Sequence, residues 1–413
     1  MGSRVILHSD MNCFYASIEM MLHPQLRGRA VAVCGSTETR HGIVLAKSEL
    51  AKKAGIKTGM VNWEAKRLCP ELIFVSPHFE EYIKYSKLAR SIYQRYTDFV
   101  EPYGMDECFL DVTGSVDMYG SGMDIAERLR CEIREELGLT VSIGVSYNKV
   151  FAKLGSDMKK PDAITEITAD GFKEKVWPLP ASDLFFVGRA TSKKLSRYGV
   201  NTIGELAALS PEALQQLFGK NGLLLWTYAN GLDTSPVMQK EFVMPIKSVG
   251  HGITCTSDLT KEEYVWRVML ELSQDIGHKL RQHGFKAMGV QITVKDSALD
   301  YRQFQGKMPY ASSNPMEIAA KARKLFNENY DWHLPVRAVT VRAIDLRETN
   351  ESEQIDLFVD AEKTERSEKL YDCIEEIRRR YGKHAVCSAS LIDDIKMPAY
   401  RDHDLALPGM MGR

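Results

Sequence analysis

The sequence predicts a multidomain α+β protein, and three observations support this fold class. The chain has 413 residues, which is too long for one ordinary hydrophobic core, so two to four domains are expected. In residues 4–165, short apolar runs typical of strands alternate with amphipathic helical stretches and a hairpin. Residues 248–346 then follow the order βαββαβ, which predicts a separate, smaller α+β domain.

Each element is predicted from its apolar pattern and its flanking residues. In the first part, the predicted strands are 4–10, 30–34, 42–46, 72–75 and 140–146, and the predicted helices are 14–22, 48–54, 62–68, 79–99 and 126–137. A hairpin after residue 99 carries two adjacent acids, and a further helix follows residue 146. These elements predict a mixed layer of strands and helices.

The second half of the chain is predicted in the same way. Residues 166–232 are mainly helical, with a helix, a tight turn and a helix over 187–206, and residues 233–247 look like a linker with two prolines. The βαββαβ unit is predicted at 248–255, 261–283, 286–294, 301–306, 315–328 and 336–344. A last helix over 361–381 precedes a strand-like stretch at 385–391.

The composition excludes some classes of protein and leaves others open. The formal net charge of -1 does not by itself indicate nucleic-acid binding, although residues 20–77 hold 9 Lys and Arg against 4 acids. No apolar run is long enough to span a membrane, and no signal peptide is expected. The eight cysteines form no C-x-x-C pair, so we expect reduced thiols in a cytoplasmic protein.

Three carboxylates stand at the ends of predicted strands. Asp10 follows the first apolar run, and Asp106 and Glu107 lie in the hairpin. Adjacent strand residues point to opposite faces, so the backbone would have to turn near Gly104 for both acids to reach one site. Carboxylates brought together in this way favour Mg²⁺, and two such ions form the usual site for phosphoryl transfer. The alternative is an acid pair in a solvated turn.

Basic residues supply two further candidate sites. Lys149, Lys153, Lys159 and Lys160 cluster around the helix after residue 146 and could bind a triphosphate, or form a solvated helix face. The glycine turn at 187–195 has backbone N–H groups and lysines that suit a DNA phosphate, although such turns are common between helices. In the tail, residues 354–358 could dock into a partner as a short peptide, or fold back on the chain.

Taken together, these motifs resemble the Y family of translesion DNA polymerases, in particular the bacterial polymerase IV group. The resemblance covers roughly residues 4–346 and rests on three motifs in this order: Asp10 to Ser17 after a strand, Met105-Asp106-Glu107 in a hairpin, and Ser142 to Lys149 leading to Lys153 and Lys159-Lys160-Pro161. It implies a right-hand polymerase core and a little finger. The implied domains are the palm (1–19 and 78–165), fingers (20–77), thumb (166–232), linker (233–247), little finger (248–346) and tail (347–413).

The resemblance also implies the reaction. Asp10, Asp106 and Glu107 would be catalytic and would hold two Mg²⁺ ions, with help from the Met11 carbonyl. The enzyme would add deoxynucleotides to a primer 3′ end as its template directs, with low fidelity and without proofreading.

Nucleotide contacts follow residue by residue. Phe14 and Tyr15 would lie beneath the incoming sugar, where the Tyr15 ring would exclude a 2′-hydroxyl, and Lys160 would bind the triphosphate. Lys52 stands at the place of a usual Arg and keeps its charge. Glu49 stands at the place of a usual Tyr and receives no binding role.

The remaining implied contacts are with macromolecules. The partners would be primer–template DNA, deoxynucleoside triphosphates and a sliding clamp. The protein would be a monomer and would not associate with a membrane. Thumb contacts to DNA would come from Gly188, Arg189, Thr191, Lys193 and Lys194, although Phe186 replaces the first glycine of the usual turn. The clamp would be bound through Gln354, Leu357 and Phe358.

Two other functions compete with this interpretation. One is a template-independent nucleotidyl transferase or cyclase with a palm-like core, and the other is a DNA-binding scaffold whose acids are ordinary surface groups. Template-dependent primer extension separates both from a polymerase.

Overall fold

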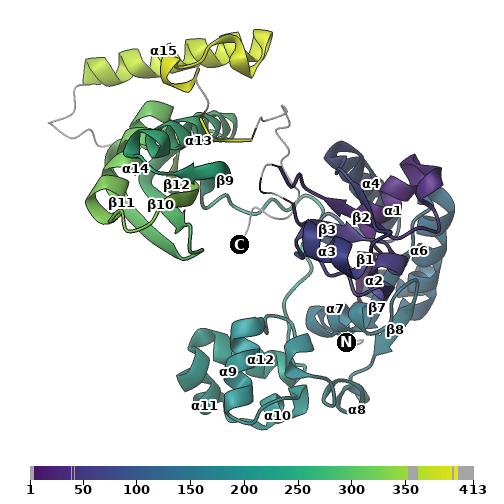
Figure 1. The fold of residues 1–413 in the computed structure, drawn as a ribbon. Coiled ribbons are helices and arrows are strands. Elements are labelled where there is room, and N and C mark those ends of the chain that lie inside the picture. Colours follow the sequence, from purple (N-terminus) through teal and green to yellow (C-terminus); the bar gives the residue numbers. More distant parts are fainter. Residues whose placement is uncertain (1–3, 39, 41, 352–360, 393–394, 399–413) are drawn as a thin grey trace.

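The computed structural model describes residues 4–38, 40, 42–351, 361–392 and 395–398. Figure 1 shows three groups of elements: the N-terminal strands and helices on the right, helices α8–α12 at the bottom and the C-terminal sheet at the upper left. The predicted multidomain α+β fold is confirmed.

The first sheet is built around β1 (Ile6–Met11), in which all six residues are buried. β1 lies antiparallel between β6 (Glu107–Asp111) and β7 (Val141–Ser146). β5 (Val100–Pro102) and β8 (Ile164–Ile167) complete the order β5-β6-β1-β7-β8. The acids at the end of β1 and the start of β6 therefore lie on neighbouring central strands.

Helices cover both faces of this sheet. α1 (Phe14–Leu22), α4 (Phe79–Tyr93) and α6 (Gly122–Leu137) pack on the face that Leu7 joins. α7 (Lys149–Met158) packs on the opposite face, against Ile6 and Phe109. Because side chains alternate along a strand, His8 and Asp10 share the α7 face with Ile6. Short helical segments follow at η1 (Pro24–Leu26), η2 (Thr113–Ser115) and α5 (Val116–Tyr119).

A second, smaller sheet stands beside the first. It has the order β3-β2-β4, with β2 (Val31–Cys34), β3 (Val44–Lys47) and β4 (Ile73–Val75). α2 (Glu49–Lys53) and α3 (Asn62–Leu68) enclose its core. Ser48 caps α2, since its side chain accepts a hydrogen bond from Ala51 N–H, and this cap sets the start of the helix that carries Glu49 and Lys52.

The helical group is connected to α7 through a shared apolar core that includes Phe151 and Leu154. Its elements are α8 (Phe172–Val176), η3 (Ala181–Asp183), α9 (Arg189–Arg197), α10 (Ile203–Ala208), α11 (Pro211–Phe218) and α12 (Lys220–Ala229). The predicted helix, turn and helix are confirmed, with Gly199 at a φ of 76° in the turn.

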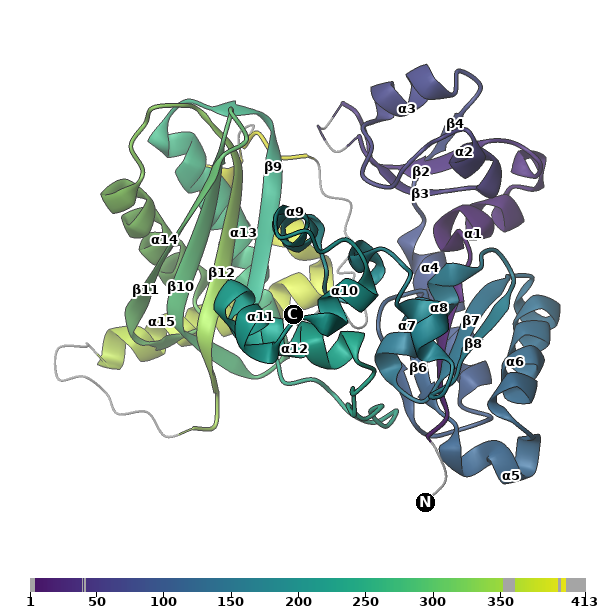
Figure 2. The ribbon, with the colours of Figure 1, turned by 90° about the horizontal axis from the view of Figure 1, so that it is seen from below.

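The C-terminal sheet confirms the βαββαβ prediction. Its antiparallel strands have the order β11-β10-β12-β9, and Figure 2 shows them side by side in this order. The elements are β9 (Val249–Leu259), α13 (Glu262–Gln282), β10 (Phe285–Asp296), β11 (Tyr301–Ser312), α14 (Pro315–Asn329) and β12 (Val336–Glu348). α13 and α14 bury the apolar side of the sheet.

α15 (Ala361–Tyr381) is held on this unit by ion pairs, such as Glu368 with Lys286 at 2.8 Å. The predicted strand at 385–391 was wrong, because two helical turns, η4 (Lys383–Ala385) and η5 (Ala389–Leu391), form there. The guanidinium of Arg378 donates hydrogen bonds to the Val386 carbonyl, which a strand would have used for pairing.

Element ends differ from the predictions where caps or turns intervene. α6 begins at Gly122, four residues early, because Ser121 and Asp124 form a capping box. α4 ends at Tyr93 rather than near residue 99, and β8 was not predicted. No helix among the described residues is long and apolar enough to cross a membrane.

Candidate functional site

Strand register brings the three predicted acids to one end of the first sheet. Asp10 pairs directly with Glu107 across β1 and β6. Asp106 precedes the first residue of β6, and its carbonyl accepts a hydrogen bond from Met11 N–H at 3.0 Å. The backbone therefore bends before Glu107, as the adjacent acids required.

Asp10 is paired with Lys160. Its side chain is only 10% exposed, and its Oδ2 atom lies 2.6 Å from Lys160 Nζ. The same ammonium lies 2.9 Å from Asp157 Oδ1. Burial opposes the charge of Lys160, but the charge and hydrogen bond of Asp10 outweigh it and raise the lysine pKa. Lys160 is therefore cationic inside the site.

Glu107 is held on its other side by α7. Its Oε2 atom lies 2.8 Å from Lys153 Nζ and 3.6 Å from Nε2 of the fully buried His8. Burial opposes the charge of Glu107, yet His8 and Lys153 outweigh it and lower its pKa. Burial also lowers the pKa of His8, whose Nδ1 lies 2.8 Å from Ser156 Oγ. Glu107 is thus an anion beside a neutral imidazole.

The other two acids resist ionisation. Burial raises the pKa of Asp10 to about 7, against the pull of Lys160, and with the Glu107 charge it raises the pKa of Asp106 to about 6. Two carboxyls whose pKa values are raised mainly by desolvation are groups that a divalent cation would stabilise in the ionised form.

The donor set fits Mg²⁺, which prefers carboxylate and carbonyl oxygens. Asp10, Asp106 and Glu107 supply carboxylate oxygens from adjacent positions, and Met11, whose carbonyl is the fourth predicted ligand, lines the neighbouring cavity. Among the described residues, no three His, Cys, Asp or Glu side chains converge as a ready metal site. Lysine ammonium groups instead hold Asp10 and Glu107, and a cation bound to Asp10 would have to replace the contact of Lys160 with its Oδ2 atom.

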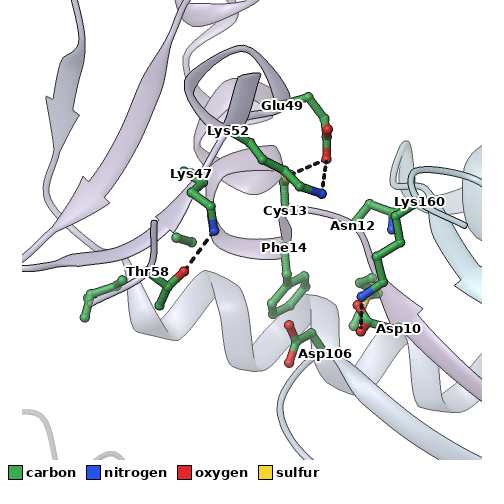
Figure 3. Close-up of a pocket in the computed structure, with 13 residues that line it drawn as sticks. Asp10, Asn12, Cys13, Phe14, Lys47, Glu49, Lys52, Thr58, Asp106 and Lys160 are labelled. Carbon is green, nitrogen blue, oxygen red and sulfur yellow. Dashed lines mark hydrogen bonds and ion pairs between the residues drawn. The ribbon is translucent and has the colours of Figure 1, made fainter. Parts of the chain in front are cut away.

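A cavity of about 290 Å³ opens beside the acids (Figure 3). Asp10 and Asp106 line it from the sheet, Phe14 lines it from α1, and Lys160 stands over Asp10. The remaining lining residues are Met11, Asn12, Cys13, Leu45, Ala46, Lys47, Glu49, Lys52 and Thr58. The cavity therefore lies between the first and second sheets.

Two predicted residues lie next to this cavity but do not line it. Glu107 faces α7, as described above. Tyr15 stacks on Tyr82 with ring centroids 4.2 Å apart, and its hydroxyl donates to Met105 Sδ at 3.3 Å. Burial and the Asp106 charge raise the pKa of Tyr15, so its hydroxyl stays protonated.

Glu49 faces the cavity, which sequence alone left open. Its Oε1 atom accepts a hydrogen bond from the Cys13 thiol at 3.0 Å and lies 3.9 Å from Lys52 Nζ (Figure 3). Lys47, also in the lining, donates to Thr58 Oγ1 at 3.0 Å. β3 and α2 thus bring two lysines and one acid to the cavity.

Sequence reasoning missed three residues of the site. Asn12 donates to Ser142 Oγ at 3.0 Å and accepts from Asp162 N–H at 2.8 Å, so it ties β1 to the turn that carries Lys160. His8 lies beside Glu107, and Lys47 lines the cavity. The alternation of His8 with Asp10 along β1 was the one available signal.

The helical group exposes most of its predicted DNA-binding residues. Gly188 is the N-cap of α9, and Arg189 and Lys193 are exposed on its first turns, with Thr191 half-buried. Lys194 instead donates to the Leu217 carbonyl and lies over the Phe218 ring. Phe186 has a φ of 67°, a left-handed conformation that explains why glycine is common at this position.

A polar surface lies on the C-terminal sheet opposite α13 and α14. Register pairing aligns Gln305, Gln291 and Arg342 across three strands, and Lys307 and Lys295 share this side. The alternate positions, such as Val290 and Ile292, are buried against the helices. The clamp-binding prediction at Gln354, Leu357 and Phe358 lies outside the described residues.

Three family models match the chain. Residues 9–157 match the impB/mucB/samB family, and residues 246–357 match the C-terminal domain of that family. Between them, residues 182–233 match a model described as the DNA polymerase-iota thumb domain. The matches follow the chain in the order of its three structural groups.

Curated relatives and a solved structure agree. The chain is 49% identical to DNA polymerase IV of Acetivibrio thermocellus, over 95% of this chain and 98% of that protein. It is 37% identical to DNA polymerase IV 1 of Bacillus subtilis, over 92% of this chain and 91% of that protein. A Y-family DNA polymerase chimera of Dbh and Dpo4 has the same fold, with a TM-score of 0.72 at 23% identity over 83% of this chain and 98% of that one. The chain therefore belongs to the impB/mucB/samB family of Y-family DNA polymerases, alongside the bacterial DNA polymerases IV.

Proposed function

We propose that this DNA-directed DNA polymerase of the translesion type adds deoxynucleotides to a primer 3′ end by Mg²⁺-dependent phosphoryl transfer in the cavity beside Asp10. The observation that carries the proposal is the direct pairing of Asp10 with Glu107, next to Asp106 and in front of a cavity lined with lysines. Carboxylates on one side and ammonium groups on the other suit a metal-bound triphosphate.

Asp10, Asp106, Glu107 and the Met11 carbonyl would hold two Mg²⁺ ions. When bound, these ions supply charge that neutralises the triphosphate and favours the alkoxide of the primer 3′-hydroxyl. Lys160 would exchange its contact with Asp10 for one with the triphosphate, since metal would take over the neutralisation of that acid. Lys52 would contribute a second positive charge from α2.

Phe14 and Tyr15 would form the floor beneath the sugar. Phe14 lines the cavity, and the stack of Tyr15 on Tyr82 fixes the position of the Tyr15 ring. A ring held in this way would collide with a 2′-hydroxyl rather than move aside, and so Tyr15 would act as the steric gate.

We also propose the domain boundaries that were predicted from the sequence. The palm would comprise 1–19 and 78–165, the fingers 20–77, the thumb 166–232 and the little finger 248–346. Primer–template DNA would contact Gly188, Arg189, Thr191 and Lys193 on the thumb and the polar surface of the C-terminal sheet. Lys194 would contribute only after leaving the Leu217 carbonyl. Low fidelity and the lack of proofreading belong to the same proposal.

Further parts of the proposal concern the surroundings of the enzyme. We propose that residues 354–358 bind a sliding clamp and that the polymerase itself is a monomer. We also propose a reducing, cytoplasmic environment, because eight scattered cysteines without a C-x-x-C pair are typical of reduced thiols.

Single-nucleotide extension of a primer–template with Mg²⁺ tests the reaction. We expect template-matched insertion by the wild type, occasional mismatched insertion, no removal of the primer 3′ end, and loss of insertion in Glu107→Gln. Asp170→Asn, which changes an exposed acid outside the cavity lining, is the control and should retain activity. Insertion that ignores the template, or equal activity of Glu107→Gln and wild type, would contradict the proposal.

A further inference from the structure

Tyr103 lies where the hairpin that carries the acids meets the helical group. It precedes Asp106 by three residues, and its backbone N–H donates to the Glu107 carbonyl at 2.9 Å. Its ring is therefore fixed relative to the backbone of a proposed metal ligand.

The Tyr103 ring contacts both neighbouring units. It makes an edge contact with Phe109 of β6, with centroids 5.6 Å apart, and a second edge contact with Phe185, also at 5.6 Å. Phe185 belongs to the loop before α9, where it contacts Phe186 at 4.3 Å and Tyr228 of α12 at 6.3 Å. One ring thus joins the sheet to the helical group.

The Tyr103 ring also contacts Lys153, the lysine that forms the ion pair with Glu107. Lys153 Nζ lies 5.1 Å from the Tyr103 ring centroid and 2.8 Å from Glu107 Oε2. The Lys153 side chain is 16% exposed, so the ring attracts a largely desolvated ammonium group. Without the ring, a flexible lysine side chain would have other rotamers available.

We propose that Tyr103 is a positioning residue. Its ring fixes Lys153 against Glu107, and because the same ring contacts Phe185, it couples the Lys153–Glu107 contact to the position of the helical group. This inference rests on the proposed function, because it assigns Glu107 a role in metal binding. When the helical group binds DNA, its position would then influence the orientation of Glu107, one of the proposed metal ligands. Tyr103 itself is not among the residues that line the cavity.

The alternative is that Tyr103 only packs between two units. Packing alone would alter thermal stability or DNA affinity, whereas positioning alters the Mg²⁺ dependence of insertion. The informative variants are Tyr103→Leu, which removes the ring, Tyr103→Phe, which keeps it, and Lys153→Met, which removes the ammonium group.

Insertion is measured against Mg²⁺ concentration with saturating DNA and nucleotide. For Tyr103→Leu we expect the half-saturating Mg²⁺ concentration to change about fivefold and kcat to fall, and for Tyr103→Phe we expect values within about twofold of wild type. In the Lys153→Met background, Tyr103→Leu should have little further effect, because the residue through which it acts is gone.

Two results would overturn the inference. One is a wild-type Mg²⁺ curve in Tyr103→Leu, whatever its thermal midpoint or DNA affinity, and the other is a full Tyr103→Leu effect in the Lys153→Met background. An inactive wild type would instead reject the proposed function, so the two failures are distinguishable.

Discussion

The charge on Asp10 and Asp106 depends on what occupies the site. Their pKa values are raised to about 7 and about 6 in the folded chain, whereas an unfolded Asp has a pKa of about 3.9. A raised carboxyl pKa stabilises the fold below the unfolded value, and this contribution is lost as pH rises through the folded pKa. Without metal, these two acids therefore oppose folding most above neutral pH.

Mg²⁺ should reverse this effect, because it binds the deprotonated carboxylates. We predict that the rise in melting temperature produced by Mg²⁺ grows between about pH 5.5 and about pH 8. Glu107 does not add to this dependence, since its lowered pKa keeps it ionised across the range. Thermal melts with and without Mg²⁺ measure the effect, and Asp10→Asn combined with Asp106→Asn should abolish it. An equal rise at both ends of the pH range would contradict the assignment.

Tyr15 gives a prediction about sugar selection. Replacement with Ala removes a ring that is held against Tyr82, so a ribonucleotide should fit where it was excluded. We expect the kcat/KM ratio of ribonucleotide to deoxynucleotide insertion to rise by about 100-fold or more. Tyr82→Phe is the control, since it keeps the stacked ring and loses only the hydroxyl. An unchanged ratio in Tyr15→Ala would limit Tyr15 to core packing.

The sequence predicted the acids but not the residues that orient them. Asp10, Asp106 and Glu107 could be found because carboxylates at strand ends have few structural uses. Asn12 and His8 could not, because their roles depend on partners such as Asp162 and Ser156, about 150 residues away. Glu49 could not be placed for the same reason, since its side chain is oriented by Cys13.

α7 illustrates how an element places two site lysines at once. Gly144 in β7 lies directly beneath this helix, and a Cβ atom there would stand 1.8 Å from the Ala152 carbonyl oxygen and 2.6 Å from Ser156 N. Only glycine allows this approach, which brings Lys153 to Glu107. The glycine was part of the recognised motif, but its packing role required the helix position.

We predict that Gly144→Ala displaces α7 and destabilises the fold by about 3 kcal/mol or more, since backbone atoms cannot yield as a side chain can. Urea unfolding measures the change. Gly114→Ala is the control, because no atom lies within 4 Å of its added Cβ, and it should cost less than about 1 kcal/mol. Equal midpoints for the two variants would show that α7 can shift without cost.

At the level of the whole molecule, the chain between the helical group and the C-terminal sheet is more ordered than predicted. Residues 233–247 have the composition of a linker, yet Val237 is 3% exposed and packs with Ile6 and Phe109. Glu101 accepts hydrogen bonds from Lys149 Nζ at 2.7 Å and from Met238 N–H at 2.9 Å. Composition could not reveal this, because the binding surface is assembled from β1, β5, β6 and α7.

Although the net charge of the chain is -1, the polar side of the C-terminal sheet carries basic residues that should make DNA binding depend on salt concentration. Lys307 and Arg342 lie on the polar side of the C-terminal sheet, where each can neutralise a phosphate. We predict that Lys307→Ala and Arg342→Ala each reduce the slope of log affinity against log salt concentration by about 0.9. Titration of fluorescent primer–template DNA across salt concentrations measures the slope.

Lys324→Ala on α14 is the matched control, because that lysine is 65% exposed on the helical side of the same unit and should leave the slope unchanged. If all three variants share the wild-type slope, the polar side of the sheet does not contact the phosphates. If Lys324→Ala alone lowers it, DNA binds over α14 instead, and the orientation proposed for the little finger is reversed. The comparison therefore decides which face of the C-terminal sheet unit the duplex meets, which composition alone could not reveal.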